Sequence, residues 1–172
     1  MVLIADCHVM NVIPFLYLEW YGIPMNVLVM YDSNFGNTKR IAESIATEIG
    51  TGAKILHVSK VTAASLENIK LLIAGSPING WRPTEAMMQF LSGLQKGQLK
   101  GLSVASFDTR IRVFFHGDAT KKIAESLKKA GATVIVQPEA FYVLGKEGPL
   151  AEGEIERAKQ WAKKTIHAVP SV

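Results

Sequence analysis

From residue 26 onwards, short apolar runs alternate with longer stretches whose apolar residues recur every three or four positions. A short apolar run is typical of a strand buried on both faces, and the wider spacing is typical of an amphipathic helix. Strands that alternate with helices favour a parallel sheet, because each crossover helix packs on one face of it. The pattern therefore predicts a doubly wound α/β fold, with five parallel strands between two layers of helices.

The expected strands are short and rich in Val, Ile and Leu. They cover residues 26–31, 53–58, 69–74, 102–107 and 133–136, and the last one resumes at 141–144. The expected helices are residues 38–49 and the apolar stripes that begin at Met87, Ile123 and Ile155. Gly50 and Gly131 are typical helix-ending residues.

Composition and length limit the chemistry. A chain of 172 residues with 48% hydrophobic and 20% charged residues is typical of one globular domain. Cys7 is the only cysteine, which excludes an internal disulfide framework and a Cys-rich zinc site. The four histidines lack metal-ligand spacing, so no metal site is expected. No nucleophile elbow is present, and no catalytic residue is expected.

Residues 1–24 differ from the rest of the chain. They are apolar, but polar residues and Pro14 interrupt them, so neither a membrane span nor a signal peptide is expected. Three interpretations stay open: a start codon placed too far upstream of Met25, a docking or dimerising arm, or a loosely held tail. We therefore expect an N-terminal extension of doubtful status (1–24) and one domain (25–172). A single thiol fits a reducing compartment, and a cytoplasmic protein is expected.

Positive charge is confined to the domain. All 19 Lys and Arg residues lie beyond residue 24, and the formal net charge of the chain is +4. Paired lysines on helices are typical of a solvated face, and the alternative is attraction of an anion such as a nucleotide or an acidic partner protein. No stacking-aromatic or recognition-helix motif accompanies the charge, so no nucleic-acid partner is expected.

Ligands of open α/β sheets bind beyond the carboxyl ends of the strands. The first segment at this place links the first strand to the first helix and contains Ser33, Asn34, Phe35, Gly36, Asn37 and Thr38. Free N–H groups at a helix N-terminus bind phosphate, and a glycine lets the backbone approach it closely. The alternative is an ordinary turn with an Asn or Thr cap. A P-loop and a dinucleotide fingerprint are both excluded, because neither glycine pattern is present.

This segment resembles the phosphate loop of the flavodoxin family, whose pattern is T/S-x-T/S-G-x-T, and the resemblance covers about residues 25–168. It implies the strand order 2-1-3-4-5, a three-layer sandwich and FMN as cofactor, with the FMN phosphate held by backbone N–H groups and hydroxyls. Phe35 departs from the pattern, because family members usually have a hydroxyl residue there.

Two further segments resemble the loops that border the flavin ring in this family. The second loop contains Pro77, Ile78, Asn79, Gly80 and Trp81, and the third contains Asp108, Thr109 and Arg110. The resemblance implies a peptide at Asn79-Gly80 that flips to hydrogen-bond flavin N5. Trp81 is expected either to stack on the ring or to serve as partial core or lid. Asp108 and Arg110 are expected to border the ring or to form an exposed ion pair worth about 0–1 kcal/mol.

The resemblance favours a single-domain electron carrier, in which FMN does the chemistry and unidentified redox proteins are the partners. The basic domain differs from acidic flavodoxins and implies different partners. One alternative is an FMN-dependent oxidoreductase acting on a quinone or porphyrinogen, for which His116 is the one histidine near the site. Another is a flavodoxin-like domain that has lost FMN. A receiver domain is disfavoured, since Gly75 and Ser76 follow the third strand in place of a phosphoryl-accepting Asp. The oligomeric state stays open.

Overall fold

Residues 25–112 and 117–170 are described by the computed structural model, so the N-terminal extension and His116 lie outside the described residues. Parallel strands form one sheet in the order β2-β1-β3-β4-β5, and β6 also pairs with β4. Their bounds are β1 Val27–Tyr31, β2 Ala53–His57, β3 Leu71–Pro77, β4 Ser103–Ile111, β5 Thr133–Val134 and β6 Glu139–Val143. The predicted fold and strand order are confirmed, with β5 and β6 sharing the fifth position.

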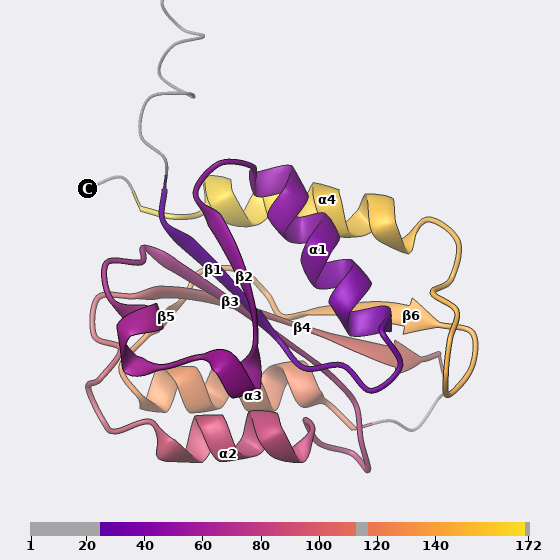
Figure 1. Ribbon diagram of the computed structural model, residues 1–172, viewed down its shortest axis with the longest axis horizontal. Coiled ribbons are helices and arrows are strands. Elements are labelled where there is room, and N and C mark those ends of the chain that lie inside the picture. The colour runs from indigo at the N-terminus through magenta and orange to yellow at the C-terminus, as the bar shows by residue number, and fades with distance from the viewer. Residues whose placement is uncertain (1–24, 113–116, 171–172) are drawn as a thin grey trace, which may run out of the picture.

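Helices cover both faces of the sheet. α1 (Asn37–Ile49) and α4 (Glu154–His167) lie on one face, and α2 (Glu85–Gly93) and α3 (Ala119–Lys129) lie on the other (Figure 1). Two short 3-10 turns, Val58–Lys60 and Ala63–Leu66, join β2 to β3. None of the helices in the described ranges is long and apolar enough to span a bilayer.

Alternate residues of each strand feed two separate cores, because successive side chains of a strand point to opposite faces. Val27 and Val29 pack under α1 and α4, whereas Leu28 and Met30 pack against the α2 and α3 side. In the first core, three aromatic rings from β4, β6 and α4 meet edge to face, with centroids between 5.9 and 6.3 Å apart. These contacts fix the outer strands relative to α4.

The central strands extend further than their sequences predict. β4 was expected to end at Phe107, but it continues to Ile111, because β3 pairs with it as far as Thr109 and β6 pairs with residues 107–111. The prediction that residues 108–111 form a loop is therefore wrong. β3 likewise runs to Pro77, so the start of the second predicted loop is part of the sheet. Both extensions bring polar residues to the carboxyl edge while their backbones remain in the ladder.

Candidate functional site

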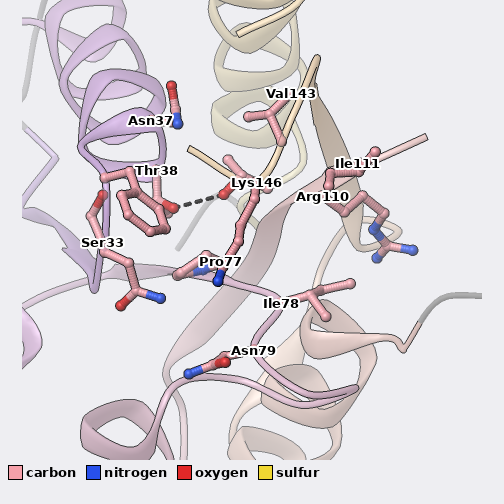
Figure 2. A pocket seen from close by; sticks show the side chains of 13 residues that line it. Ser33, Asn37, Thr38, Pro77, Ile78, Asn79, Arg110, Ile111, Val143 and Lys146 are labelled. Atoms are coloured by element: carbon pink, nitrogen blue, oxygen red, sulfur yellow. Dashed lines mark hydrogen bonds between the residues drawn. The ribbon is translucent and has the colours of Figure 1, made fainter. Parts of the chain in front are cut away.

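A pocket of about 130 Å³ opens at the carboxyl ends of the strands, which is below the roughly 300–1,000 Å³ usual for small-molecule sites. Its lining residues come from four segments (Figure 2): Ser33, Asn34, Phe35, Asn37, Thr38, Pro77, Ile78, Asn79, Thr109, Arg110, Ile111, Val143 and Lys146. Larger hollows of about 400 and 570 Å³ lie elsewhere, at the amino ends of the strands and between α2 and α3. Neither of these two hollows contains a predicted site residue.

Most of the predicted site residues meet in this lining. Gly36, Gly80, Trp81 and Asp108 adjoin it in sequence without being part of it. The sequence analysis missed Ile111, Val143 and Lys146. The first two are missed because their exposure toward the pocket depends on how β4 and β6 pair. Lys146 lies in a Gly-Lys-Glu-Gly run. Its glycines are a turn signal, from which a loop at this edge of the sheet could have been predicted.

The N-terminus of α1 is left open for a ligand. Gly36 is its N-cap at φ 84°, no side chain caps it, and its first turn holds no acidic residue. The other three described α-helices differ: Thr84 caps α2, Asp118 caps α3, and α4 has acidic residues in its first turn. The alternative of an Asn or Thr cap on α1 is therefore not what the structure shows. Uncapped N–H groups and the helix dipole favour an anion here.

Three hydroxyls lie at the same place. Ser33 Oγ is buried and has no hydrogen-bond partner among the described residues, an arrangement that costs about 1–3 kcal/mol unless a ligand satisfies it. The hydroxyls of Thr38 and Thr109 lie 2.7 Å apart and are buried (Figure 2). Only one of the two threonine protons is used in that contact, so the other is available to an acceptor in the pocket. The candidate phosphate loop (33–38) thus presents donors and carries no negative charge of its own.

Asp32 holds this loop in place from below. Its Oδ1 accepts from the backbone N–H of Ser33 at 2.7 Å and from His57 Nε2 at 2.9 Å, and its Oδ2 accepts from Thr84 Oγ1 at 2.5 Å. One nearly buried carboxylate therefore joins the phosphate loop, the end of β2 and the start of α2. A network with its partners in place rigidifies the loop before any ligand arrives.

The second predicted loop is a tight turn. Asn79 and Arg82 exchange two backbone hydrogen bonds, N to O at 2.8 Å and 3.3 Å. The two residues between them, Gly80 and Trp81, have φ of 55° and 72°, as a two-residue hairpin turn requires. Trp81 is strained in this conformation, and it is 59% exposed. Its stacking on a flavin ring stays a prediction.

Neighbouring elements hold the backbone of Trp81. A Cβ added to Gly117 would lie 2.2 Å from Trp81 Cα, so the two backbones are in close contact and only glycine fits there. Lys122 Nζ donates to the Trp81 carbonyl at 3.3 Å. Gly117 and Lys122 of α3 therefore maintain the strained turn, and surroundings of this kind are what allow strain to persist at functional sites.

Asp108 and Arg110 form the expected ion pair, but the prediction that it is exposed is wrong. Arg110 Nε lies 2.7 Å from Asp108 Oδ1, and the side chains are 6% and 0% exposed. Asp108 Oδ2 also accepts from Thr120 N at 3.0 Å, and Arg110 Nη2 reaches Asp118 at 3.4 Å. The pair is buried because the extended β4 passes under the start of α3. Burial raises the pKa of Asp108, opposed by the Arg110 hydrogen bond.

No cluster of three or more His, Cys, Asp and Glu side chains suited to a metal ion occurs in residues 25–112 and 117–170. The pocket lining itself contains Arg110 and Lys146 but no Asp or Glu. The arrangement is therefore suited to a small anion carrying an aromatic or apolar portion, with polar backbone and hydroxyl donors at one end of the pocket.

The family model that matches the chain is that of flavodoxin, over residues 29–161. A comparison with curated protein sequences finds no match. Oxidised flavodoxin 2 from Bacillus cereus superposes with a TM-score of 0.72 at 20% sequence identity, covering 83% of this chain and 98% of that one. The flavodoxin, WrbA-like protein from Agrobacterium tumefaciens superposes with a TM-score of 0.68 at 18% sequence identity, covering 84% of this chain and 97% of that one.

A larger redox protein contains a similar fold. The rubredoxin oxygen:oxidoreductase from the anaerobe Desulfovibrio gigas gives a TM-score of 0.69 at 21% identity. The match covers 89% of this chain but only 38% of that one. At these identities the structural matches show the fold alone, and the family rests on the match of the sequence model.

Proposed function

The chain belongs to the flavodoxin family, and on that premise we propose that it binds FMN at the carboxyl edge of its sheet and passes electrons to and from partner proteins. FMN supplies the redox chemistry when it is bound, and the protein supplies binding, orientation and shielding. The observation that carries the proposal is the uncapped N-terminus of α1 beside the unpartnered, buried hydroxyl of Ser33.

The residues at this edge fit the parts of FMN. The donors of the phosphate loop suit a phosphate, and no side chain of the pocket lining is acidic. Pro77, Ile78 and Ile111 provide an apolar wall that excludes water. We propose that the turn after the lining residue Asn79, with the exposed Trp81 two residues further on, covers the flavin ring. Asp108 takes part through its backbone only, because Arg110 and the start of α3 use its carboxylate.

The distribution of exposed apolar side chains supports a protein partner. Among the described residues, the large exposed apolar side chains are Phe35, Trp81, Ile111 and Leu144. Each either lines the pocket or lies within two residues of a lining residue. Apolar groups gathered around one pocket are typical of an interaction site. A partner that docks there would meet the cofactor at its exposed edge, and the basic domain favours an acidic partner.

A visible absorption spectrum of the purified protein, recorded before and after addition of FMN, tests the proposal. Flavin bands that shift on binding, with quenching of FMN fluorescence, are the expected result. A protein that binds no FMN would retain the fold and lose the proposed function. Anaerobic stepwise reduction then separates the two classes of redox protein, because a carrier is expected to accept single electrons in resolved steps. Turnover of NAD(P)H with a quinone would favour the oxidoreductase alternative instead.

A further inference from the structure

The pocket lining has one positive charge that no carboxylate neutralises. Of its two basic residues, Arg110 is paired with Asp108 in the buried contact described above. None of the ion pairs found within residues 25–112 and 117–170 includes Lys146. The adjacent Glu147 is not among the lining residues. A cation in a pocket lined by donors indicates a ligand with negative charge.

The turn between β6 and α4 fixes the backbone of Lys146. Gly148 N donates to Gly145 O at 3.1 Å, which places Lys146 at the second position of a four-residue turn. Leu144 N donates to Pro149 O at 2.9 Å, and Leu150 anchors the returning chain in the core beneath α1 and α4. Two hydrogen bonds and a core residue therefore hold a lysine that is otherwise exposed.

Asn37 attaches this turn to the phosphate loop. Its Nδ2 donates to the carbonyl of Glu147 at 2.9 Å. A Cβ added to Gly148 would lie 2.7 Å from both Asn37 Oδ1 and Nδ2, so glycine permits the close approach. From the turn, the Lys146 side chain extends into the space between the phosphate loop and Pro77 (Figure 2). The side chain of Asn37 is thus committed to the turn and sets the position of Lys146.

We propose that Lys146 binds the phosphate of the ligand as its counter-charge, and that Asn37 is a positioning residue acting through the β6–α4 turn. The inference rests on the proposed FMN site and deepens it: this pocket selects the phosphorylated flavin over riboflavin by charge as well as by neutral donors. A lysine ammonium is a point charge suited to phosphate, and partial exclusion of water by the pocket walls strengthens the attraction.

Flavin titrations of matched variants test the role of Lys146. Dissociation constants for FMN and for riboflavin are measured by fluorescence quenching in the native protein, Lys146→Gln and Lys146→Arg. Lys54→Gln is the control, because it removes the same charge from an exposed position on β2, near the amino ends of the strands. Lys146→Gln is expected to weaken FMN binding about ten- to a hundredfold and to leave riboflavin binding unchanged. Lys146→Arg should retain most of the affinity, and Lys54→Gln all of it.

Two results would overturn the inference and differ from one another. If the native protein binds neither flavin, the proposed function is wrong, and this inference is wrong as well because it rests on the same site. If the native protein binds FMN, but Lys146→Gln weakens the binding of FMN and riboflavin equally or weakens the binding of neither, then Lys146 is not the phosphate ligand. In that case the proposed function still stands. Raising the ionic strength gives an independent readout, since screening should weaken FMN binding in the native protein more than in Lys146→Gln.

A double-mutant cycle tests the role of Asn37. Asn37→Ala alone is expected to weaken FMN binding, since the turn is released from the loop. In the Lys146→Gln background the same change should cost little more, because residues that act through one another give non-additive effects. Full additivity of the two losses would mean that Asn37 contacts the ligand directly, and would overturn its role as a positioning residue.

Discussion

Replacing Arg110 with Met tests whether the buried ion pair secures the end of β4. In the native protein, Asp108 and Arg110 are almost completely buried, and Arg110 donates to both carboxylate oxygens. Asp108 also accepts the backbone N–H of Thr120 at the start of α3. The substitution keeps an unbranched side chain of similar reach and removes the charge, so it leaves the carboxylate of Asp108 buried without its counter-ion.

The structure sets the expected size of the effect. Breaking a buried pair by removing one partner costs about 3–5 kcal/mol, compared with a total stability of roughly 5–15 kcal/mol for a domain. With a urea m-value of about 1–3 kcal/mol/M, the midpoint of unfolding should fall by roughly 1–5 M. The deficit should shrink in acid, because burial raises the pKa of Asp108 and a protonated carboxyl needs no counter-charge. The pKa of Asp108 in the folded state lies above its unfolded value. The folded state therefore gains stability as pH falls through the folded pKa toward the unfolded pKa.

Urea unfolding followed by circular dichroism measures the effect, with two comparisons. Lys159→Met disrupts an exposed pair with Glu156, 3.4 Å long with side chains 36% and 64% exposed, and should cost less than about 1 kcal/mol. The double variant Asp108→Leu with Arg110→Met removes both charges and should recover much of the loss. A loss below about 1 kcal/mol for Arg110→Met, or a double variant no better than the single one, would refute the reasoning.

Three further predictions concern the loops and the start of α3. Gly36→Val should cost about 1–2 kcal/mol of stability and weaken FMN binding, because Gly36 has φ 84°. The cost comes from the backbone, since nothing within 4 Å obstructs a Cβ. Urea unfolding measures the loss of stability, and flavin titration measures the loss of affinity. Thr38→Val should weaken FMN binding roughly fivefold. The control Thr165→Val removes a buried hydroxyl bonded to its own helix and should leave FMN binding unchanged. Equal FMN affinities in the two variants would contradict the proposed role of the phosphate loop. For Asp118, burial acts to raise the pKa, but hydrogen bonds from Lys121 and the attraction of Arg110 outweigh it and lower the pKa below 3.8. Asp118→Asn should therefore cost about 0.3–1 kcal/mol near neutral pH, and this cost should vanish as pH falls through the folded pKa, which a pH series of urea midpoints would show.

The architecture and the position of the candidate site could be predicted from local sequence. Apolar runs such as Val27–Tyr31 form strands buried on both faces because each side packs against helices. The stripe of α1 and the glycines around it marked the boundaries of that helix. The candidate phosphate loop (33–38) could be proposed from the sequence because the chemistry of such a loop depends on consecutive residues and on the backbone of one helix terminus. Properties of this kind are set by neighbours in the chain, and sequence carries them directly.

Other features depend on partners that are distant in the chain. Residues 108–111 form a strand because β3 and β6 lie beside them. The same pairing places Asp108 and Arg110 beneath α3, so that a pair expected at the surface is buried.

Lys146 reaches the pocket because Asn37, 110 residues away from Glu147, holds its turn. The sequence by itself determined the fold class, the strand order through the family pattern, and the loop that suits a phosphate. Only the tertiary structure decided which side chains enter the pocket, which charges are already paired, and which lysine is left for a ligand. The physical reason is that burial and charge pairing are set by contacts across the sheet edge, where segments far apart in the chain come together.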